Sequence, residues 1–299
     1  MIDKLTKDSI GFISGLFPER SDEGHKGSFG TLLVVGGSKY MTGALNLTVS
    51  SALRSGVGMV RAFAPEDALM PVRINCPCAL TSSFEEEDNL LRKAGELMNS
   101  SSAVVIGPGL DINDKRSMRL LEFFVTGAKN LVIDASALNL LSKSGSPDML
   151  GLGKRERLGL NRAVLTPHVG EFKRFDVPVI NYNDFDNDGL YETCKIFSKK
   201  TDSVLVLKNH NTLVTTPDGK CYYNYGDNSG MAKGGSGDVL AGLIGGFLAL
   251  GMEPEHAAIA GVFVHSRAGK KAASNLTKLH MLPTDIIDMF PLVYKELGW

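Results

Sequence analysis

The residues of this chain best suited to chemistry form the run Gly-Gly-Ser-Gly-Asp at positions 234–238, which leads directly into an apolar segment. Small residues such as Gly235 and Gly237 leave successive backbone N–H groups exposed where a helix begins. These donors, together with the helix dipole, can bind a phosphoryl group. Asp238 would lie at the mouth of that anion hole, where a carboxylate can act as general base toward a hydroxyl that attacks phosphorus. In the alternative interpretation Asp238 only caps the helix and the glycines form a tight turn, which explains one glycine better than three.

The run at 234–238 is neither of the two commonest phosphate-binding motifs. It lacks the Gly-x-x-x-x-Gly-Lys-Ser/Thr pattern of a Walker A loop, and it is not a Gly-x-Gly-x-x-Gly turn after a strand near the N-terminus. A second segment, Gly-Gly-Ser-Lys at 36–39, resembles another anion-binding turn, with Lys39 either as countercharge or as an ordinary surface lysine. The sequence therefore predicts phosphate chemistry outside the two common motifs.

Three further segments place glycines or polar residues after predicted strands, where open α/β sheets bind their ligands. Gly107 and Gly109 flank a proline, so they either let the backbone approach a ligand or form an ordinary tight turn. Asp134 ends an apolar run, and such a carboxylate contacts ribose or a metal, or caps the next helix. His168 follows Thr166 through a proline turn, and it either contacts a ligand or, like Thr166, caps the helix that follows.

The elements that must position these residues alternate between short apolar runs and longer helical windows. This alternation is typical of a mainly parallel sheet covered by helices on both faces. Strands are predicted at 31–35, 58–63, 103–106, 131–134, 163–166, 204–208 and 212–215, with 220–224 as an added edge strand. Helices are predicted at 43–54, 115–124, 137–142, 185–199, 238–250, 254–273 and 284–296. Only three residues separate 204–208 from 212–215, so these two strands are expected to form an antiparallel hairpin.

The composition is that of one globular domain. The 299 residues are 43% hydrophobic and 22% charged, and no linker or repeat divides them. The formal charge of -1 gives no reason to expect a nucleic-acid partner, and the acidic run at 85–88 is predicted to be a solvated surface. The four cysteines are expected to be reduced thiols. Without an apolar signal region or a long apolar stretch, a cytoplasmic protein with no membrane partner is expected.

These motifs, in this order, resemble the ADP/ATP-dependent NAD(P)H-hydrate dehydratases, a branch of the ribokinase-like superfamily. The resemblance runs from about residue 26 to the last predicted helix. It is carried by Lys-Gly-Ser-Phe-Gly at 26–30, Gly-Ala at 43–44, Ala-Leu-Arg-Ser-Gly at 52–56, Ile-Gly-Pro-Gly-Leu at 106–110, Ile-Asp-Ala at 133–135, Leu-Thr-Pro-His-Val-Gly-Glu at 165–171, Leu-Lys at 207–208 with Thr212, and Gly-Met-Ala-Lys-Gly-Gly-Ser-Gly-Asp-Val-Leu at 230–240. It implies a three-layer α/β/α ribokinase-like fold with a mainly parallel central sheet. That fold would form a single domain over residues 1–299, with residues 1–25 as an N-terminal extension.

The resemblance also implies an activity: repair of NADHX and NADPHX, the hydrated and inactive forms of the reduced nicotinamide cofactors. In such enzymes ADP or ATP phosphorylates the ring hydroxyl, and loss of phosphate restores the dihydropyridine. Asp238 would deprotonate that hydroxyl, and the amides of Gly235, Ser236 and Gly237 would hold the phosphoryl group. The hydrate would be bound by Ala44, Gly107, Gly109, His168 and Asp238. The adenine nucleotide would be bound by Lys208, Asn209, His210, Asn211, Thr212 and Gly237, with Mg²⁺ bridging its phosphates through protein ligands that remain unknown.

The same resemblance implies a homo-oligomer, with a tetramer as one form, and a separate epimerase as functional partner. A vitamin or sugar kinase of the same fold is the alternative function, because this centre would phosphorylate any suitably placed hydroxyl. A non-catalytic nucleotide-binding protein is a third hypothesis, against which the carboxylate of Asp238 argues. Whether ADP or ATP is preferred is left open.

Four positions depart from the family pattern. Asn209 stands where a glycine usually follows the lysine, and Asn is expected to tolerate a left-handed backbone there. Val169 and Ser229 replace prolines, which weakens the rigidity of two turns more than it affects chemistry. Lys233 stands where Thr is frequent, and it either adds countercharge or points to solvent.

Overall fold

One ten-stranded sheet organises the chain in the computed structural model, which describes residues 3–84, 89–143, 152, 155, 161–177 and 188–299. The strand order is β1-β10-β9-β8-β7-β6-β5-β2-β3-β4. The strands are β1 Asp3–Leu5, β2 Thr31–Val35, β3 Met59–Ala64, β4 Leu80–Ser83, β5 Ala103–Ile106, β6 Leu131–Ile133, β7 Val164–Leu165, β8 Val204–Lys208, β9 Thr212–Thr215 and β10 Cys221–Asn224. Strand β9 is antiparallel to both of its neighbours, and the other pairs are parallel.

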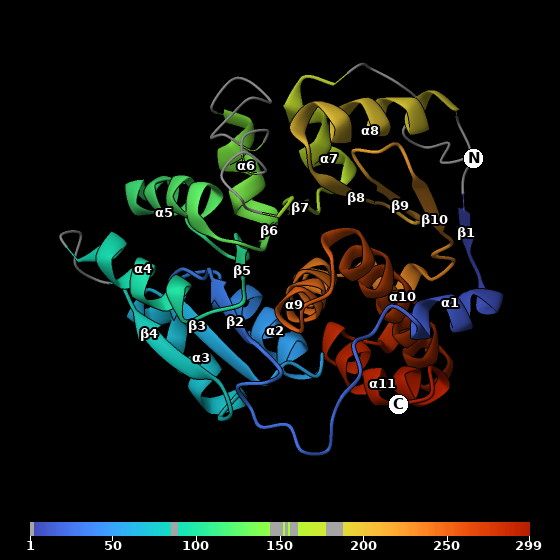
Figure 1. Ribbon diagram of the computed structural model, residues 1–299, viewed down its shortest axis with the longest axis horizontal. Helices are drawn as coiled ribbons and strands as arrows, with labels where there is room; N and C mark the ends of the chain where they lie inside the picture. Colours follow the sequence, from blue (N-terminus) through green and yellow to red (C-terminus); the bar gives the residue numbers. More distant parts are fainter. Residues whose placement is uncertain (1–2, 85–88, 144–151, 153–154, 156–160, 178–187) are drawn as a thin grey trace.

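Helices cover both faces of this sheet (Figure 1). On one face lie α1 Ile10–Ser14, α2 Thr42–Leu53, α3 Glu66–Asn75, α9 Ser236–Ala249, α10 Pro254–His280 and α11 Pro283–Glu296. On the other lie α4 Leu90–Asn99, α5 Lys115–Gly127, α6 Ala135–Lys143, α7 Val169–Phe172 and α8 Asp188–Thr201. Alternate strand residues enter the two cores, as where Leu32 faces one core and Leu33 the other. The predicted three-layer α/β/α architecture is confirmed.

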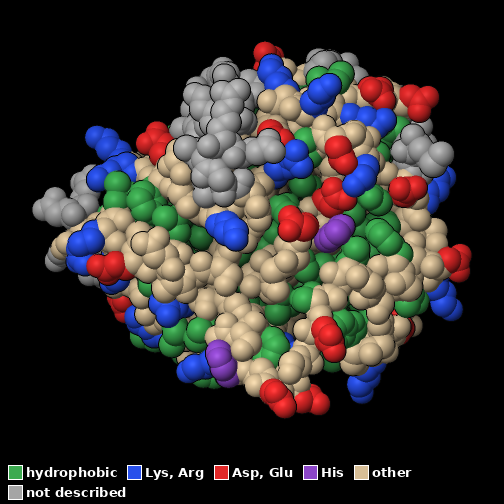
Figure 2. Space-filling model, viewed as in Figure 1, with side chains coloured by type: hydrophobic (Ala, Val, Ile, Leu, Met, Phe, Trp, Pro, Cys, Tyr) green, Lys and Arg blue, Asp and Glu red, His purple; other side chains and the backbone are tan. Residues whose placement is uncertain are grey.

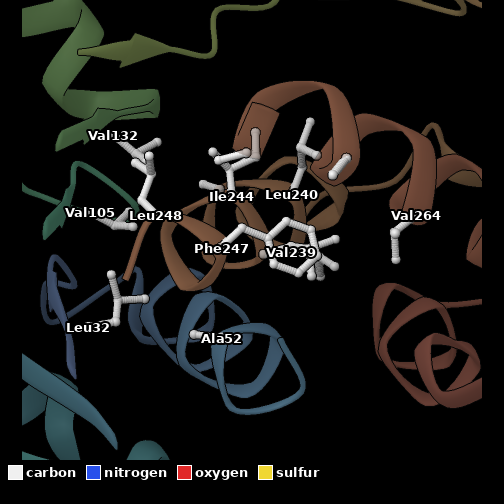
Figure 3. Close-up of a cluster of buried hydrophobic side chains, with 14 of the residues drawn as sticks. Leu32, Ala52, Val105, Val132, Val239, Leu240, Ile244, Phe247, Leu248 and Val264 are labelled. Atoms are coloured by element: carbon white, nitrogen blue, oxygen red, sulfur yellow. The ribbon is translucent and has the colours of Figure 1, made fainter. Parts of the chain in front are cut away.

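Helix α9 is apolar on all sides because it lies in the middle of one core. Figure 3 shows Ile244, Phe247 and Leu248 of α9 between sheet residues such as Val105 and the neighbouring helices. Glycine permits this close packing, since a Cβ on Gly242 would lie 2.2 Å from the carbonyl oxygen of Thr48 in α2. The start of α9, where the predicted anion hole lies, is therefore fixed by a rigid core.

The predicted strands are confirmed to within one or two residues, and the hairpin of β8 and β9 is as expected. The segment at 220–224 is not an edge strand, because β1 pairs with β10 on its outer side. Elements β1, β4, α1, α3 and α4 were not predicted from the sequence. Strand β4 is polar and only half-buried at the sheet edge, and β1 buries a single residue, so neither has the apolar run of a central strand. Residues 85–88 and 185–187 lie outside the described residues.

The strand order reverses direction between β2 and β5. From β2 the chain proceeds outward through β3 and β4, and from β5 it proceeds the opposite way through β6, β7 and β8. Ligands of open α/β sheets bind at such a switch point, beyond the carboxyl ends of the strands. The loops that follow β2 and β5 are thus placed where a substrate site is expected.

The surface carries charges of both signs. On the face shown in Figure 2, Lys and Arg side chains are interspersed with Asp and Glu. Within the described residues, no helix combines the length and apolar character needed to cross a membrane.

Candidate active site

The start of α9 has the geometry of an anion hole. Gly235 is the N-cap residue, and its φ of 102° is a left-handed backbone that residues with a Cβ rarely adopt. The backbone N–H groups of Gly235, Gly237 and Asp238 have no hydrogen-bond partner among the described residues. That of Ser236 donates a long bond of 3.3 Å to the carbonyl of Lys233. The helix start therefore offers free donors to an anion.

A buried ion pair joins the ends of neighbouring strands. Nζ of Lys208, at the end of β8, lies 2.8 Å from Oδ1 of Asp134, which follows β6. The same oxygen accepts a 2.7 Å hydrogen bond from Oγ1 of Thr166, which follows β7. Asp134 is only 1% exposed. This placement favours a role for Asp134 in holding Lys208 over the ribose, metal and helix-cap roles that the sequence left open.

Lys208 reaches from the sheet to the glycine run. A Cβ on Gly237 would lie 3.1 Å from Nζ of Lys208, so the ammonium packs against this glycine. Burial alone would lower the pKa of Lys208, but attraction to Asp134 and Glu171 outweighs it, and the pKa is raised. A fixed cation beside free amides stabilises negative charge on a transferring phosphoryl group.

Asp238 is a carboxylate whose proton affinity is tuned by its surroundings. Burial, then the negative charge of Asp134, raises the pKa of Asp238 to about 7; Glu171 adds to this increase and Lys208 opposes it. A carboxylate with a pKa near neutrality is far more basic than an ordinary aspartate and still ionises at physiological pH. Its position on the first turn of α9 places it beside the anion hole, as the sequence predicted.

His168 forms the start of α7. Its Nδ1 accepts hydrogen bonds from the backbone N–H groups of Gly170, at 2.9 Å, and Glu171, at 3.3 Å. In return Oε2 of Glu171 accepts a 2.9 Å bond from the backbone N–H of His168. The helix-cap alternative is thus confirmed for His168. Because Nδ1 accepts, the neutral ring carries its proton on Nε2, and the ring lines the cavity described next.

A cavity of about 860 Å³ opens beside the glycine run. Of the predicted residues, His168, Lys208, Asn209, His210, Thr212, Ser236 and Gly237 all line it. The side chains of Lys208, Lys233 and Lys278 give it positive charge, with Asp227 as the one acid among its lining residues. The predicted nucleotide residues are thus brought together, with one exception, in a space that suits a polyanion.

The exception is Asn211, which is buried in the β8–β9 turn. Its Nδ2 donates to the hydroxyl of Tyr223 at 2.6 Å, and its Oδ1 accepts a 2.9 Å bond from the N–H of Gly226. It therefore holds the cavity loop at Gly226 rather than lining the cavity itself. The neighbouring Asn209 has no positive φ, so the β8–β9 turn forms without the left-handed backbone that Asn was expected to tolerate.

Three of the predicted hydrate-binding residues, Ala44, Gly107 and Gly109, lie at the switch point between β2 and β5, whereas His168 lines the cavity. Gly109 has a φ of 72°, and a Cβ on it would lie 3.2 Å from Cβ of Ala44 at the start of α2. A Cβ on Gly107 would lie 1.8 Å from the carbonyl oxygen of Asp134, so this glycine permits close backbone packing. None of the three lines the 860 Å³ cavity, and neither does Asp238. The structure thus separates the cavity from the switch point, where Gly107 packs against Asp134, the acid whose charge acts on Asp238.

The structure also shows the surroundings of Lys233, Lys39 and the four cysteines. Nζ of Lys233 donates to the carbonyls of Leu279 and Met281, so this lysine anchors the end of α10 besides adding charge to the cavity. The four cysteines are free thiols. Nζ of Lys39 lies 5.8 Å from the ring centroid of Tyr40.

Sequence reasoning missed His265, Asn228 and Lys278, which line the same cavity. Asn228 caps the turn before the glycine run and donates to the carbonyl of Gly269 in α10. Lys278 donates to the carbonyl of Asp227 at 3.0 Å. The available signal was His265 itself, a histidine inside the apolar window predicted as a helix.

Among the described residues, no group of three or more His, Cys, Asp or Glu side chains could hold a metal ion. Mg²⁺ does not need such a group, since it keeps several waters and is bound through one or two carboxylates and substrate phosphates. Glu171, whose charge acts on both Lys208 and Asp238, is an acid of the right chemistry for such an ion. The donor set therefore fits an ion held chiefly by nucleotide phosphates.

Curated proteins and solved structures resemble this chain over nearly its whole length. The bifunctional NAD(P)H-hydrate repair enzyme Nnr of Moorella thermoacetica is 33% identical over 290 residues, covering 94% of this chain and 52% of that protein. The ADP-dependent (S)-NAD(P)H-hydrate dehydratase of Bacillus subtilis is 30% identical and covers 95% of this chain and 96% of that protein. The chain thus spans about half the length of the bifunctional relatives that it matches.

Two solved structures share the fold. The ADP/ATP-dependent NAD(P)H-hydrate dehydratase from Bacillus subtilis, co-crystallized with ATP/Mg²⁺, has a TM-score of 0.82 at 29% identity, with 99% of each chain covered. A ribokinase-like superfamily protein from Enterococcus faecalis has a TM-score of 0.79 at 28% identity, covering 99% of this chain and 96% of that one. The predicted ribokinase-like fold is confirmed. The family model for NAD(P)H-hydrate dehydratase matches residues 32–292, and the chain belongs to that family.

Proposed function

We propose that this chain is a nucleotide-dependent NAD(P)H-hydrate dehydratase, which returns NADHX and NADPHX to NADH and NADPH. The observation that carries the chemistry is Asp238, a carboxylate with a pKa raised to about 7 beside a helix start with free amides and a fixed lysine. Such a centre suits transfer of a phosphoryl group to a hydroxyl. Family membership supports the hydrated nicotinamide as the molecule whose hydroxyl accepts the phosphoryl group.

In this proposal Asp238 takes the proton of the ring hydroxyl as its oxygen attacks the terminal phosphorus of the nucleotide. AMP leaves when the nucleotide is ADP, and ADP leaves when it is ATP. The amides of Gly235 and Gly237, the Ser236 residue between them and the ammonium of Lys208 hold the charge that builds on the phosphoryl oxygens. The ring C–O bond then breaks, phosphate departs with the electron pair, and loss of a ring proton restores the dihydropyridine.

The nucleotide is assigned to the 860 Å³ cavity, because its lining joins three lysines to the free amides of the glycine run. The hydrate is assigned to the switch-point region around Ala44, Gly107 and Gly109, with Asp238 and the cavity residue His168 completing its site. Mg²⁺ would neutralise the nucleotide phosphates. Use of ATP with Mg²⁺ is supported by the Bacillus subtilis relative co-crystallized with ATP/Mg²⁺, and use of ADP by the ADP dependence of the Bacillus subtilis dehydratase.

Wider features of the proposal come from the relatives. We propose an NAD(P)HX epimerase as a functional partner, since bifunctional NAD(P)H-hydrate repair enzymes are among the relatives. The proposed dehydratase acts in the cytoplasm as a homo-oligomer, and its oligomeric state can be measured by light scattering.

The test is to incubate the full chain and Mg²⁺ with NADHX and either ADP or ATP. A dehydratase releases inorganic phosphate and restores the near-ultraviolet absorbance of the reduced nicotinamide in equal amounts. A small-molecule kinase of the same fold would instead leave a stable phosphorylated acceptor and no reduced cofactor. Absence of both phosphate release and NADH with either nucleotide would refute the proposed activity.

A further inference from the structure

The nucleotide cavity contains a histidine with an unpaired nitrogen. His265 lies on α10, is 8% exposed and lines the cavity. Its Nε2 is buried and has no hydrogen-bond partner among the described residues. Leaving a buried polar atom unpaired costs about 1–3 kcal/mol, and such atoms are rare in folded proteins. Water does not reach Nε2, so a ligand that displaces the side chains over it would supply a partner and remove this cost.

The ring of His265 is neutral near pH 7. Burial lowers the pKa of His265 to about 4; a hydrogen bond with the backbone of Ser236 opposes this, and the charge of Lys208 adds to it. A backbone bond that favours the protonated ring is one in which a ring N–H donates to the carbonyl. Because Nε2 is the unpaired nitrogen, Nδ1 carries that proton. Nε2 of the neutral ring is therefore a bare acceptor.

Because Nε2 of His265 can only accept a hydrogen bond, its partner on the ligand must be a hydrogen-bond donor. The phosphate oxygens of a Mg²⁺-bound nucleotide carry no proton at neutral pH, so they cannot donate a hydrogen bond to Nε2. The donors of an adenine nucleotide are the ribose hydroxyls and the amino group of the base. Since His265 is bonded to Ser236, the first residue of α9, its ring adjoins the phosphate end of the cavity. The ribose lies next to the phosphates, whereas the amino group lies at the far end of the base.

We propose that His265 is a ribose-recognition residue, in which Nε2 accepts a hydrogen bond from a ribose hydroxyl of the bound nucleotide. The inference rests on the nucleotide occupying this cavity, as proposed above. It adds a specificity contact from α10 to the contacts made by the glycine run and the β8–β9 turn.

A second unpaired atom in the same cavity supports this proposal. Oγ of Ser236 is also buried without a partner among the described residues, and Ser236 lines the cavity. A hydroxyl can donate to a phosphate oxygen, which His265 cannot. The two unpaired atoms thus match the two adjoining parts of a nucleotide, a hydroxyl donor and a phosphate acceptor.

The experiment measures the affinity of the full chain for ADP, 2′-deoxy-ADP and 3′-deoxy-ADP by calorimetry. One deoxy analogue is expected to bind the wild type about 3- to 10-fold more weakly than ADP, the range of one neutral hydrogen bond. His265→Asn retains a group at the Nδ1 position and loses Nε2, so it is expected to bind ADP and that analogue equally. His265→Gln places its amide near the Nε2 position and is expected to retain the preference for ADP.

The matched control is His256→Gln, the same substitution on the surface of the same helix. It is expected to bind ADP and both analogues like the wild type. Thermal unfolding of each variant shows whether the chain still folds, and the ratio of two affinities within one variant is independent of the fraction folded.

Equal binding of all three nucleotides by the wild type would overturn the proposal, as would a preference for ADP that persists in His265→Asn. An analogue without the amino group tests the other donor. If it binds the wild type weakly and His265→Asn removes that difference, the partner is the base and the ribose assignment is wrong. The binding assay contains no hydrate, so a ribose preference that depends on His265 stands even if NADHX is not turned over. Turnover without that preference overturns only the ribose assignment.

Discussion

Nζ of Lys208 lies 2.8 Å from Oδ1 of Asp134, and this buried pair sets the position of the cation beside the glycine run. The two residues follow β8 and β6, which are separated by β7. Thr166, at the end of β7, donates to the same carboxylate oxygen. The sheet therefore fixes both the site of positive charge and the negative charge that, after burial, does most to raise the pKa of Asp238.

Asp134→Asn is expected to destabilise the protein by roughly 3 kcal/mol, because it leaves the ammonium of Lys208 buried without its partner. Loss of the negative charge also lowers the pKa of Asp238, so the low-pH limb of kcat/KM moves to lower pH. Urea denaturation and a pH–rate profile measure the two effects. Thr166→Val is the control, since it removes one hydrogen bond and keeps the ion pair. An unchanged limb in Asp134→Asn would show that the two carboxylates are not coupled.

Asp238→Asn is expected to reduce kcat by about a thousandfold while leaving nucleotide affinity nearly unchanged, because an amide cannot take the proton of the attacking hydroxyl. In the wild type the base must be ionised, so kcat/KM should rise with pH through about 7 and then level off. Single-turnover kinetics and calorimetry with ADP separate the two quantities. A wild-type acid limb near pH 4, or a fully active Asn variant, contradicts the role of base.

The same substitution has a predictable effect on stability. The folded-state pKa of Asp238 is raised from the ordinary 3.8 to about 7, so the unfolded chain loses its proton first as pH rises. The wild type therefore loses stability between about pH 4 and pH 7, whereas Asp238→Asn does not. The variant should match the wild type below pH 4 and exceed it at pH 8 by roughly 4 kcal/mol. Denaturation at both pH values measures this, and equal stability at pH 8 contradicts the raised pKa.

Gly237→Ala tests the contact between Lys208 and the glycine run. The added Cβ would lie 3.1 Å from Nζ of Lys208, and a flexible side chain can move away, so the fold should survive. Displacement of the ammonium is expected to reduce kcat by about 10- to 100-fold. Gly234→Ala is the control within the same run, because a Cβ there meets nothing within 4 Å. Equal activity of the two variants would show that the position of the ammonium does not matter.

The sequence predicted the parts of the site that depend on local chemistry. A run of small residues before an apolar segment was enough to predict the helix start of α9 and the position of Asp238. The strands β2, β5, β8 and β9 matched because each is an apolar run bounded by turn residues.

Contacts between residues far apart in the chain could not be predicted from the sequence. The bond of Asp134 to Lys208 spans 74 positions and depends on the order of strands in the sheet, which no local pattern encodes. His265 was missed for the same reason, since it approaches the glycine run only through the packing of α10 against α9. Strand β4 was not predicted because a polar, half-exposed edge strand lacks periodic apolar residues.

Gly109→Ala tests the region assigned to the hydrate. The added Cβ would lie 2.5 Å from the carbonyl oxygen of Met41 and would force the loop after β5 away from the start of α2. Because this region lies apart from the nucleotide cavity, the KM for NADHX should rise at least about tenfold while ADP affinity stays unchanged. Gly219→Ala is the matched control: its φ of 87° gives the same backbone strain, but a Cβ there meets nothing within 4 Å. A rise in KM for both variants would assign the effect to general strain, and a loss of ADP affinity in Gly109→Ala would place the nucleotide, not the hydrate, at the β2–β5 switch point.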